Sequence, residues 1–262
     1  MEILVCVRRV PDTSENEIQL NGAGNDIERD ELVYSVNEWD NYAVEEALQI
    51  AARVGGKVTV VTVGGEDDEE VLRRQMAMGA NGGVLISDEA FAGSDGRGIA
   101  TLLAAFVKQG RYDLILTGVQ AEDGAAQVGG MLAAMLDYPF ASLVNSIEVV
   151  DGRLRIGREI EGGNQEINEI DLPSVLSIQT GINEPRYVGM KGIRQVASIP
   201  IPTLGAADLG VDAGSVGAAA AKAARVDYFV PVLGRGAEML KGDRDAVIDR
   251  LIELMKANGG LK

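Results

Sequence analysis

The chain has 262 residues, of which 46% are hydrophobic, so it can bury a full core as one large domain or as one domain with an appendage. Its 24 basic and 40 acidic residues give a net charge of −16, which repels phosphate backbones and anionic headgroups. We therefore expect no nucleic-acid partner and no direct insertion into a membrane.

Histidine is absent and Cys6 is the single cysteine, which excludes histidine acid–base catalysis and an internal disulfide. We interpret Cys6 as a small buried hydrophobe within "EILVCV". The acidic stretch "EDDEE" (66–70) is the best candidate for an all-oxygen metal site, but its position favours the solvated first turn of a helix. No metal site is predicted.

We also expect no targeting signal in this sequence. The sequence begins directly in an apolar strand, and no apolar run approaches the ~18 residues of a spanning helix. Together with the lone cysteine, this predicts an unexported, cytoplasmic protein.

Apolar strands alternate with amphipathic helices over the first half of the chain. Such alternation is typical of a parallel sheet covered on both faces, so the fold class is α/β with a doubly wound, mainly parallel sheet. The predicted strands are 2–10, 57–65, 82–87 and 112–118, and the predicted helices are 40–55, 68–80, 98–110 and 126–137.

The pattern changes after residue 145. Polar and apolar residues alternate around Asp151-Gly152, which predicts an antiparallel hairpin at about 146–162. A buried strand in "DLPSVLSIQTG" follows, then a tract of low periodicity, and finally an amphipathic helix at 243–260. We therefore divide the chain into an α/β domain (1–180), a partner-binding arm (181–235) and a C-terminal helix (236–262).

Ligands of parallel sheets bind beyond the carboxyl ends of the strands, here at 8–13, 62–68 and 117–130. In the third segment, the small residues of the turn 123–126 let backbone N–H groups of the next helix approach a phosphate. No lysine stands in this turn, so it is not a Walker A loop, and no GxGxxG follows the first strand. Packing alone would also explain the small residues, so nucleotide binding and packing both remain open here.

The segment "INEPRYVGMKGIRQ" (182–195) places Met190 at an exposed tip. An exposed apolar side chain costs solubility and normally marks a contact surface. Packing of Met190 against the chain's own surface is the alternative.

The stretch "IGREIEGGNQEINEIDLPSVLSI" (156–178) resembles the signature of the electron-transfer flavoprotein β subunit. The resemblance runs nearly end to end, through "VRRVPDT", "VNEWDNYAVEEAL", "AMGAN", "TGVQAEDGAAQVG", "INEPRY" and "GAEMLKGDRDAVIDRL". It implies an adenine-nucleotide α-hydrolase-like sheet and an electron carrier rather than a stand-alone enzyme. Its implied partners are an α subunit that holds a redox-active FAD and an acyl-CoA-type or other flavin dehydrogenase. The matching residues of the signature are Arg158, Glu161, Gly162, Gly163, Pro173 and Ser177.

The resemblance also implies an adenine nucleotide, AMP or a second FAD, in this chain. It places Trp39 and Thr13 at the edge of the α-subunit flavin, although core packing is the alternative for Trp39. Partner contacts are implied for Glu159 at the α interface and for Arg186, Tyr187 and Met190 at the dehydrogenase. The implied nucleotide contacts are Val7, Arg8, Asn37, Asp40, Val63, Gly64, Asp123, Gly124, Ala125, Ala126, Gln127, Val128 and Gly129.

Two departures leave the choice between AMP and FAD open. The tract 214–229 lacks the Ser-Pro-Thr turn of many relatives. The segment 90–101 resembles the FAD-binding subgroup around Phe91 and Gly93 but lacks the threonine after the aspartate. A universal-stress-type nucleotide-binding regulator and a nucleotide-α-hydrolase enzyme are the alternative functions. The enzyme would need a PP-motif with lysine or histidine, which is absent.

Overall fold

The computed structural model describes residues 1–121, 125–231, 236–237 and 239–261. Its contacts divide the chain into two units. The first comprises residues 1–19 and 28–226, and the second comprises residues 20–27 and 227–262.

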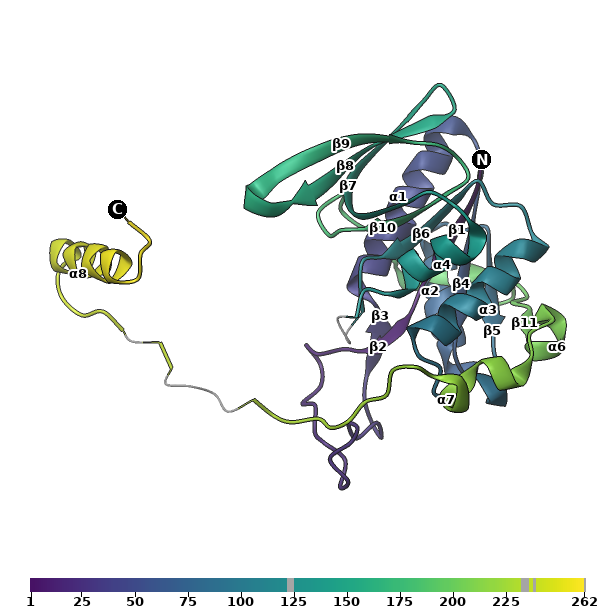
Figure 1. The fold of residues 1–262 in the computed structure, drawn as a ribbon, viewed down its shortest axis with the longest axis horizontal. Helices are drawn as coiled ribbons and strands as arrows, with labels where there is room; N and C mark the ends of the chain where they lie inside the picture. Colours follow the sequence, from purple (N-terminus) through teal and green to yellow (C-terminus); the bar gives the residue numbers. More distant parts are fainter. Residues whose placement is uncertain (122–124, 232–235, 238, 262) are drawn as a thin grey trace. The chain divides into compact units, whose positions relative to one another are not determined.

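A nine-stranded sheet forms the centre of the first unit (Figure 1). Its strand order is β11-β5-β4-β1-β6-β10-β7-β8-β9, and the first seven strands are mutually parallel. The predicted mainly parallel sheet is therefore confirmed. The parallel strands other than β7 are β1 (Glu2–Cys6), β4 (Lys57–Val63), β5 (Gly82–Ile86), β6 (Leu114–Gly118), β10 (Ser174–Ile178) and β11 (Thr203–Leu204).

Helices cover both faces of this sheet, as the doubly wound prediction requires. Side chains of a strand alternate between faces, so Ile3 and Val5 enter one core and Leu4 enters the other. The first core is closed by α1 (Glu38–Val54) and α2 (Glu69–Met78), and the second by α3 (Gly96–Gln109) and α4 (Val128–Leu136).

An antiparallel ribbon extends one edge of the sheet. The hairpin joins β7 (Phe140–Val150) to β8 (Arg153–Ile160) through Asp151 and Gly152, whose positive φ values of 49° and 81° match a type I′ turn. A third strand, β9 (Asn164–Ile170), pairs with β8 and was not predicted, because its sequence is mostly polar and its residues are mostly exposed.

The first predicted strand, 2–10, is in fact two strands. After β1, the N–H of Arg8 donates to the Asp40 carboxylate instead of to a neighbouring strand, and the chain leaves the sheet. Its continuation, β2 (Arg9–Pro11), pairs with β3 (Tyr34–Val36) in a separate antiparallel sheet. The apolar run could not reveal this break.

The tract after residue 181 contains short elements instead of an irregular loop. These elements are too short to produce a readable hydrophobic period. Segment 66–70 forms the helical start that we predicted, and the described residues contain no group of three metal-ligating side chains. The short elements after residue 181 are β11, α5 (Met190–Val196), α6 (Ala206–Leu209), α7 (Gly217–Ala220) and the 3-10 turn η4 (Ala213–Ser215). Further 3-10 turns lie earlier in the chain, at η1 (Glu66–Asp68), η2 (Glu89–Phe91) and η3 (Glu161–Gly163).

The second unit contains the C-terminal helix α8 (Arg244–Ala257), close to its predicted bounds. The carboxylate of Asp243 caps it by accepting from the N–H of Ala246 at 2.9 Å. Ile248, Leu251, Ile252 and Met255 are all partly exposed along one side. No described helix has the length and apolar character needed to cross a membrane.

Candidate functional site

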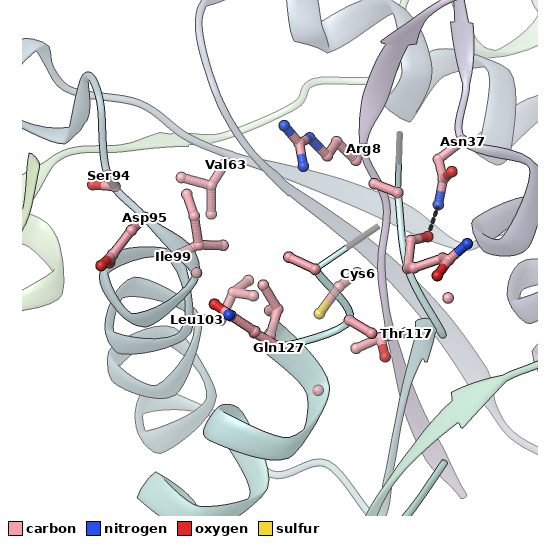
Figure 2. Close-up of a pocket in the computed structure, with 18 of the residues that line it drawn as sticks. Cys6, Arg8, Asn37, Val63, Ser94, Asp95, Ile99, Leu103, Thr117 and Gln127 are labelled. Carbon is pink, nitrogen blue, oxygen red and sulfur yellow. Dashed lines mark hydrogen bonds between the residues drawn. The ribbon is translucent and has the colours of Figure 1, made fainter. Parts of the chain in front are cut away.

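A cavity of about 690 Å³ opens at the carboxyl ends of β1, β4 and β6. The chain reverses its winding direction between β1 and β6, and doubly wound sheets bind ligands at such a point. Figure 2 shows Ser94 and Asp95 on one side of the cavity and Arg8 and Asn37 on the other. Both the volume and the position suit a small-molecule ligand.

Asp40, in the first turn of α1, ties together the two strands at this point. Its Oδ2 accepts from the N–H of Arg8 at 2.8 Å, and its Oδ1 accepts from the N–H of Gly118 at 3.0 Å. A Cβ at position 118 would lie 2.5 Å from Asp40 Oδ1 and 2.6 Å from the Trp39 Cβ. Glycine is thus required for this close approach, which fixes the cavity floor.

Burial raises the pKa of Asp40 to about 7, although hydrogen bonds from Asn37, Arg8 and Gly118 favour its charged form. Burial and the neighbouring Asp40 carboxylate likewise raise the pKa of the Cys6 thiol. Cys6 is half-buried, packs against the core that α3 and α4 close, and also lines the cavity, a second position that our interpretation as a buried hydrophobe did not include. Asn37 donates from Nδ2 to the Gln120 carbonyl at 2.9 Å and so holds the rim.

The N-terminus of α4 faces the cavity without a side-chain cap. Its first intrahelical bond runs from the N–H of Met131 to the Gln127 carbonyl, so the N–H groups of residues 128–130 precede the helical ladder. Gly129 is buried against the hydroxyls of Thr117 and Ser177, which are themselves 2.8 Å apart. The packing therefore fixes these amides at the cavity wall.

The N-terminus of α3 is arranged differently, because the Asp95 carboxylate occupies it. Asp95 accepts from the N–H of Gly98 at 2.9 Å and also from the N–H groups of Lys222 and Ala223 at 2.6 and 3.1 Å. These backbone bonds hold the pKa of Asp95 below its usual range. Ser94 Oγ accepts from Gly217 N–H at 2.8 Å, so residues 217–223 are attached here as a further wall.

The cavity brings together most of the expected nucleotide contacts. Gly64 is not among the lining residues, and Asp123 and Gly124 lie outside the described residues. The expected residues that line the cavity are Val7, Arg8, Asn37, Asp40, Val63, Ala125, Ala126, Gln127, Val128 and Gly129. Sequence reasoning missed two walls, Gly93 to Gly96 and Ala218 to Arg225.

The first missed wall makes a close contact with Gln127. A Cβ at Gly96 would lie 2.9 Å from Gln127 Oε1, so the glycine leaves room for this amide. The resemblance of segment 90–101 to the FAD-binding subgroup around Phe91 and Gly93 was the sequence signal for this wall.

The expected flavin-edge residues lie outside the cavity lining. Trp39 is half-buried, and its Nε1 donates to Gln179 Oε1 at 3.1 Å. Gln179 in turn donates to Glu159 Oε2 at 3.3 Å, which connects the expected α-interface residue to the tryptophan. Glu159 and Thr13 are both exposed.

The expected dehydrogenase contacts lie together but differ in their bonding. Arg186 forms a two-pronged ion pair with Glu45, with Nε–Oε2 and Nη2–Oε1 distances of 2.7 and 2.9 Å. Tyr187 is 93% exposed and Met190 is 67% exposed. Met190 begins helix α5, so the expected loop tip is a helix N-terminus. Because its guanidinium is held by both carboxylate oxygens of Glu45, Arg186 has a structural role within this chain.

Comparisons with known proteins agree with this architecture. Residues 25–209 match the model of the electron transfer flavoprotein domain. The electron transfer flavoprotein subunit beta of Methylophilus methylotrophus is 35% identical over 97% of this chain and 98% of its own length. The protein of the same name from Thermoanaerobacterium thermosaccharolyticum is 34% identical over 98% of both chains. A caffeyl-CoA reductase-Etf complex subunit, CarD, of Acetobacterium woodii is 35% identical over 92% of both. The chain belongs to the electron transfer flavoprotein family and corresponds along nearly its whole length to the β subunits of that family.

Proposed function

We propose that this electron-transfer subunit holds an adenine nucleotide in the cavity and pairs with an α subunit that carries FAD. The pair would accept electrons from an acyl-CoA-type or other flavin dehydrogenase. Family membership makes the chain an electron carrier rather than an enzyme and disfavours a universal-stress-type regulator.

The uncapped N-terminus of α4 carries the nucleotide proposal. Backbone N–H groups and the helix dipole at residues 128–130 suit phosphate oxygens, and Gln127 adds a neutral side-chain donor. The α3 terminus is already occupied by the Asp95 carboxylate, which would repel a phosphate. The phosphate is therefore expected at α4.

AMP and a second FAD share the adenylate group, so the same residues would hold either ligand. When bound, FAD supplies reversible redox chemistry, whereas AMP supplies none. Arg8 and Arg225 line the cavity and can balance phosphate charge. Val7, Val63 and Ile99 provide apolar surface for the adenine ring.

The test is the identity and amount of nucleotide released from the purified heterodimer. We expect a yellow complex that releases adenine nucleotide in excess of the FAD attributable to the α subunit. In Gln127→Glu, a like charge faces the phosphate, so retained nucleotide should fall by on the order of tenfold. Gln127→Ala is the matched control and should lose less. Equal retention in all three proteins would refute the site.

A further inference from the structure

One wall of the cavity is an alanine-rich segment, residues 217–225, which we call the strap. Its sequence is "GAAAAKAAR", and most of its residues are exposed. Methyl groups bury little apolar area, so side-chain packing contributes little to holding this segment. The position of the strap therefore depends mainly on its backbone hydrogen bonds. The strap residues that line the cavity are Ala218, Ala221, Ala223, Ala224 and Arg225.

The first two residues of the strap, which we call its root, are anchored by close packing. The N–H of Gly217 donates to Ser94 Oγ at 2.8 Å, and the N–H of Ala218 donates to the Ala92 carbonyl at 2.9 Å. Gly217 has a φ of 75°, and a Cβ there would overlap the Ala90 carbonyl oxygen. Glycine is required for this approach, so the root is fixed against the segment before α3.

The later part of the strap, residues 222–225, is its tip, and Asp95 holds it. The N–H groups of Lys222 and Ala223 both donate to Asp95 Oδ2, at 2.6 and 3.1 Å. The other carboxylate oxygen, Oδ1, caps α3 by accepting from the N–H of Gly98 at 2.9 Å (Figure 2). Lys222 and Ala223 are exposed, so water can replace Asp95 as the acceptor of their N–H groups.

We propose that the strap is the gate through which the nucleotide enters and leaves the cavity, with Asp95 as its latch. This inference rests on the proposed function, because the gated ligand is the adenine nucleotide proposed for the cavity. Opening breaks the two bonds at Oδ2, and the tip moves away from α3 while the root stays in place. Both bonds go to a charged acceptor and are stronger than neutral ones, so the closed form is favoured.

The first experiment follows the uptake and release of radiolabelled AMP by the purified heterodimer. Asp95→Asn should raise the association and dissociation rates together, on the order of tenfold, with a much smaller change in Kd, because entry and exit cross the same barrier. Asparagine still caps α3 through Oδ1, but its NH₂ group cannot accept the N–H groups of the tip. Loss of the Asp95 charge alone would favour the phosphate and slow dissociation, so faster dissociation reports the latch.

Asp88→Asn is the matched control for this substitution. Asp88 also accepts two backbone N–H groups, those of Ala90 and Ala206, each at 3.0 Å, but it is not among the residues that line the cavity. Asp88→Asn should therefore exchange AMP like the wild type.

Three outcomes would overturn the gate. Wild-type protein that takes up no AMP would overturn the proposed function together with this inference. Uptake at equal rates in the wild type and Asp95→Asn would overturn the gate and leave the proposed function standing. Faster dissociation without faster association in Asp95→Asn would show that the strap is a fixed wall of the site.

A second pair of variants breaks the latch from the side of the strap and keeps the Asp95 charge. Lys222→Pro removes the N–H that donates to Asp95. The preceding Ala221 has a φ of −58° and a ψ of 135°, a conformation that a residue before proline prefers. Lys222→Ala removes the same cation but retains the N–H. Lys222→Pro should exchange AMP as fast as Asp95→Asn, and Lys222→Ala should match the wild type. Equal rates in Lys222→Pro and Lys222→Ala would contradict the latch.

Amide hydrogen exchange in the intact heterodimer provides a readout that needs no ligand. The amide of Ala223 should exchange on the order of tenfold faster in Asp95→Asn than in the wild type, since its bond to the latch is weakened. The amide of Ala218 should be unchanged, because its bond to the Ala92 carbonyl remains. Equal protection of Ala223 in both proteins, or an equal loss of protection at Ala218, would overturn a tip that opens about a fixed root.

Discussion

The cavity and the segment around helix α5 use charged side chains in different ways. In the cavity, the carboxylates of Asp40 and Asp95 accept backbone N–H groups and hold separate segments together around an enclosed space. At the α5 segment, Arg73 donates to the Val196 carbonyl and Arg186 pairs with Glu45, while Tyr187 and Met190 stay exposed to solvent. One region uses its charges to enclose a space, and the other uses them to hold a segment whose apolar side chains are exposed.

The largest expected effect concerns the cavity, where the titration of Asp40 should make the free energy of unfolding depend on pH. An unfolded aspartate ionises near pH 3.8, whereas burial raises the pKa of Asp40 to about 7. Between these values the folded chain keeps a proton that the unfolded chain loses, so the free energy of unfolding falls as pH rises, by up to about 4 kcal/mol in total. The facing groups are Arg8, Cys6 and Asn37.

Thermal unfolding midpoints between pH 4 and pH 8 check this prediction. The wild type should lose stability with rising pH more steeply than Asp40→Asn, which cannot ionise. Parallel profiles of the two proteins would contradict the raised pKa.

Gly118→Ala should introduce a steric clash in the same region. The added Cβ would press against Asp40 Oδ1 and the Trp39 Cβ, so we expect a loss of about 3 kcal/mol of stability together with lower nucleotide retention. Gly82→Ala is the control, since a Cβ at that strand position meets no atom within 4 Å. Denaturant unfolding of both variants should show a large loss for Gly118→Ala only.

Arg186→Met removes an ion pair that supports the segment leading into α5. Burial tends to raise the pKa of Glu45, but hydrogen bonds from Arg186 hold that pKa below its usual range. The ion pair therefore stabilises the fold at pH values where an unfolded glutamate is ionised, and this stabilisation is lost as the pH falls through the lowered pKa of Glu45. Removing Arg186 leaves the buried Glu45 carboxylate without its cation, although the hydrogen bond from Gln49 Nε2 at 3.1 Å remains, so we expect a cost of about 2 kcal/mol because the arginine is partly exposed.

The matched control is Arg53→Met, which breaks the similarly placed Arg53–Glu46 pair at 3.0 Å, distant in sequence from α5. Both variants should lose stability, but only Arg186→Met should slow electron exchange with the dehydrogenase. If Arg186→Met and Arg53→Met changed the rate of electron exchange equally, the ion pair that supports α5 would have no functional consequence of its own.

Sequence patterns located the sheet and much of the cavity because these depend on local signals. Apolar runs mark the strands, and the small residues before Gln127 mark a turn at the carboxyl edge. The wall at 218–225 could not be predicted in this way. It is alanine-rich without a period, and its place is set by Asp95, which lies 127 residues before Lys222 in the sequence. Likewise, the ion pair of Arg186 with Glu45 spans 141 residues, so nothing local distinguished a structural arginine from an exposed contact.

The most direct test compares two single variants of the same heterodimer, with one substitution in each region. Gln127→Glu should lose adenine nucleotide, whereas Met190→Ala should keep it. Because Met190 is 67% exposed, its truncation should leave the thermal midpoint unchanged and cost about 1–2 kcal/mol in partner binding, which slows electron exchange on the order of tenfold. The measurement is released nucleotide and dehydrogenase-coupled rate for both variants. Nucleotide loss confined to Gln127→Glu, with a slow rate and intact nucleotide in Met190→Ala, is the predicted result. A normal rate with a lowered midpoint in Met190→Ala, or full nucleotide in Gln127→Glu, would contradict the division of roles between the two regions.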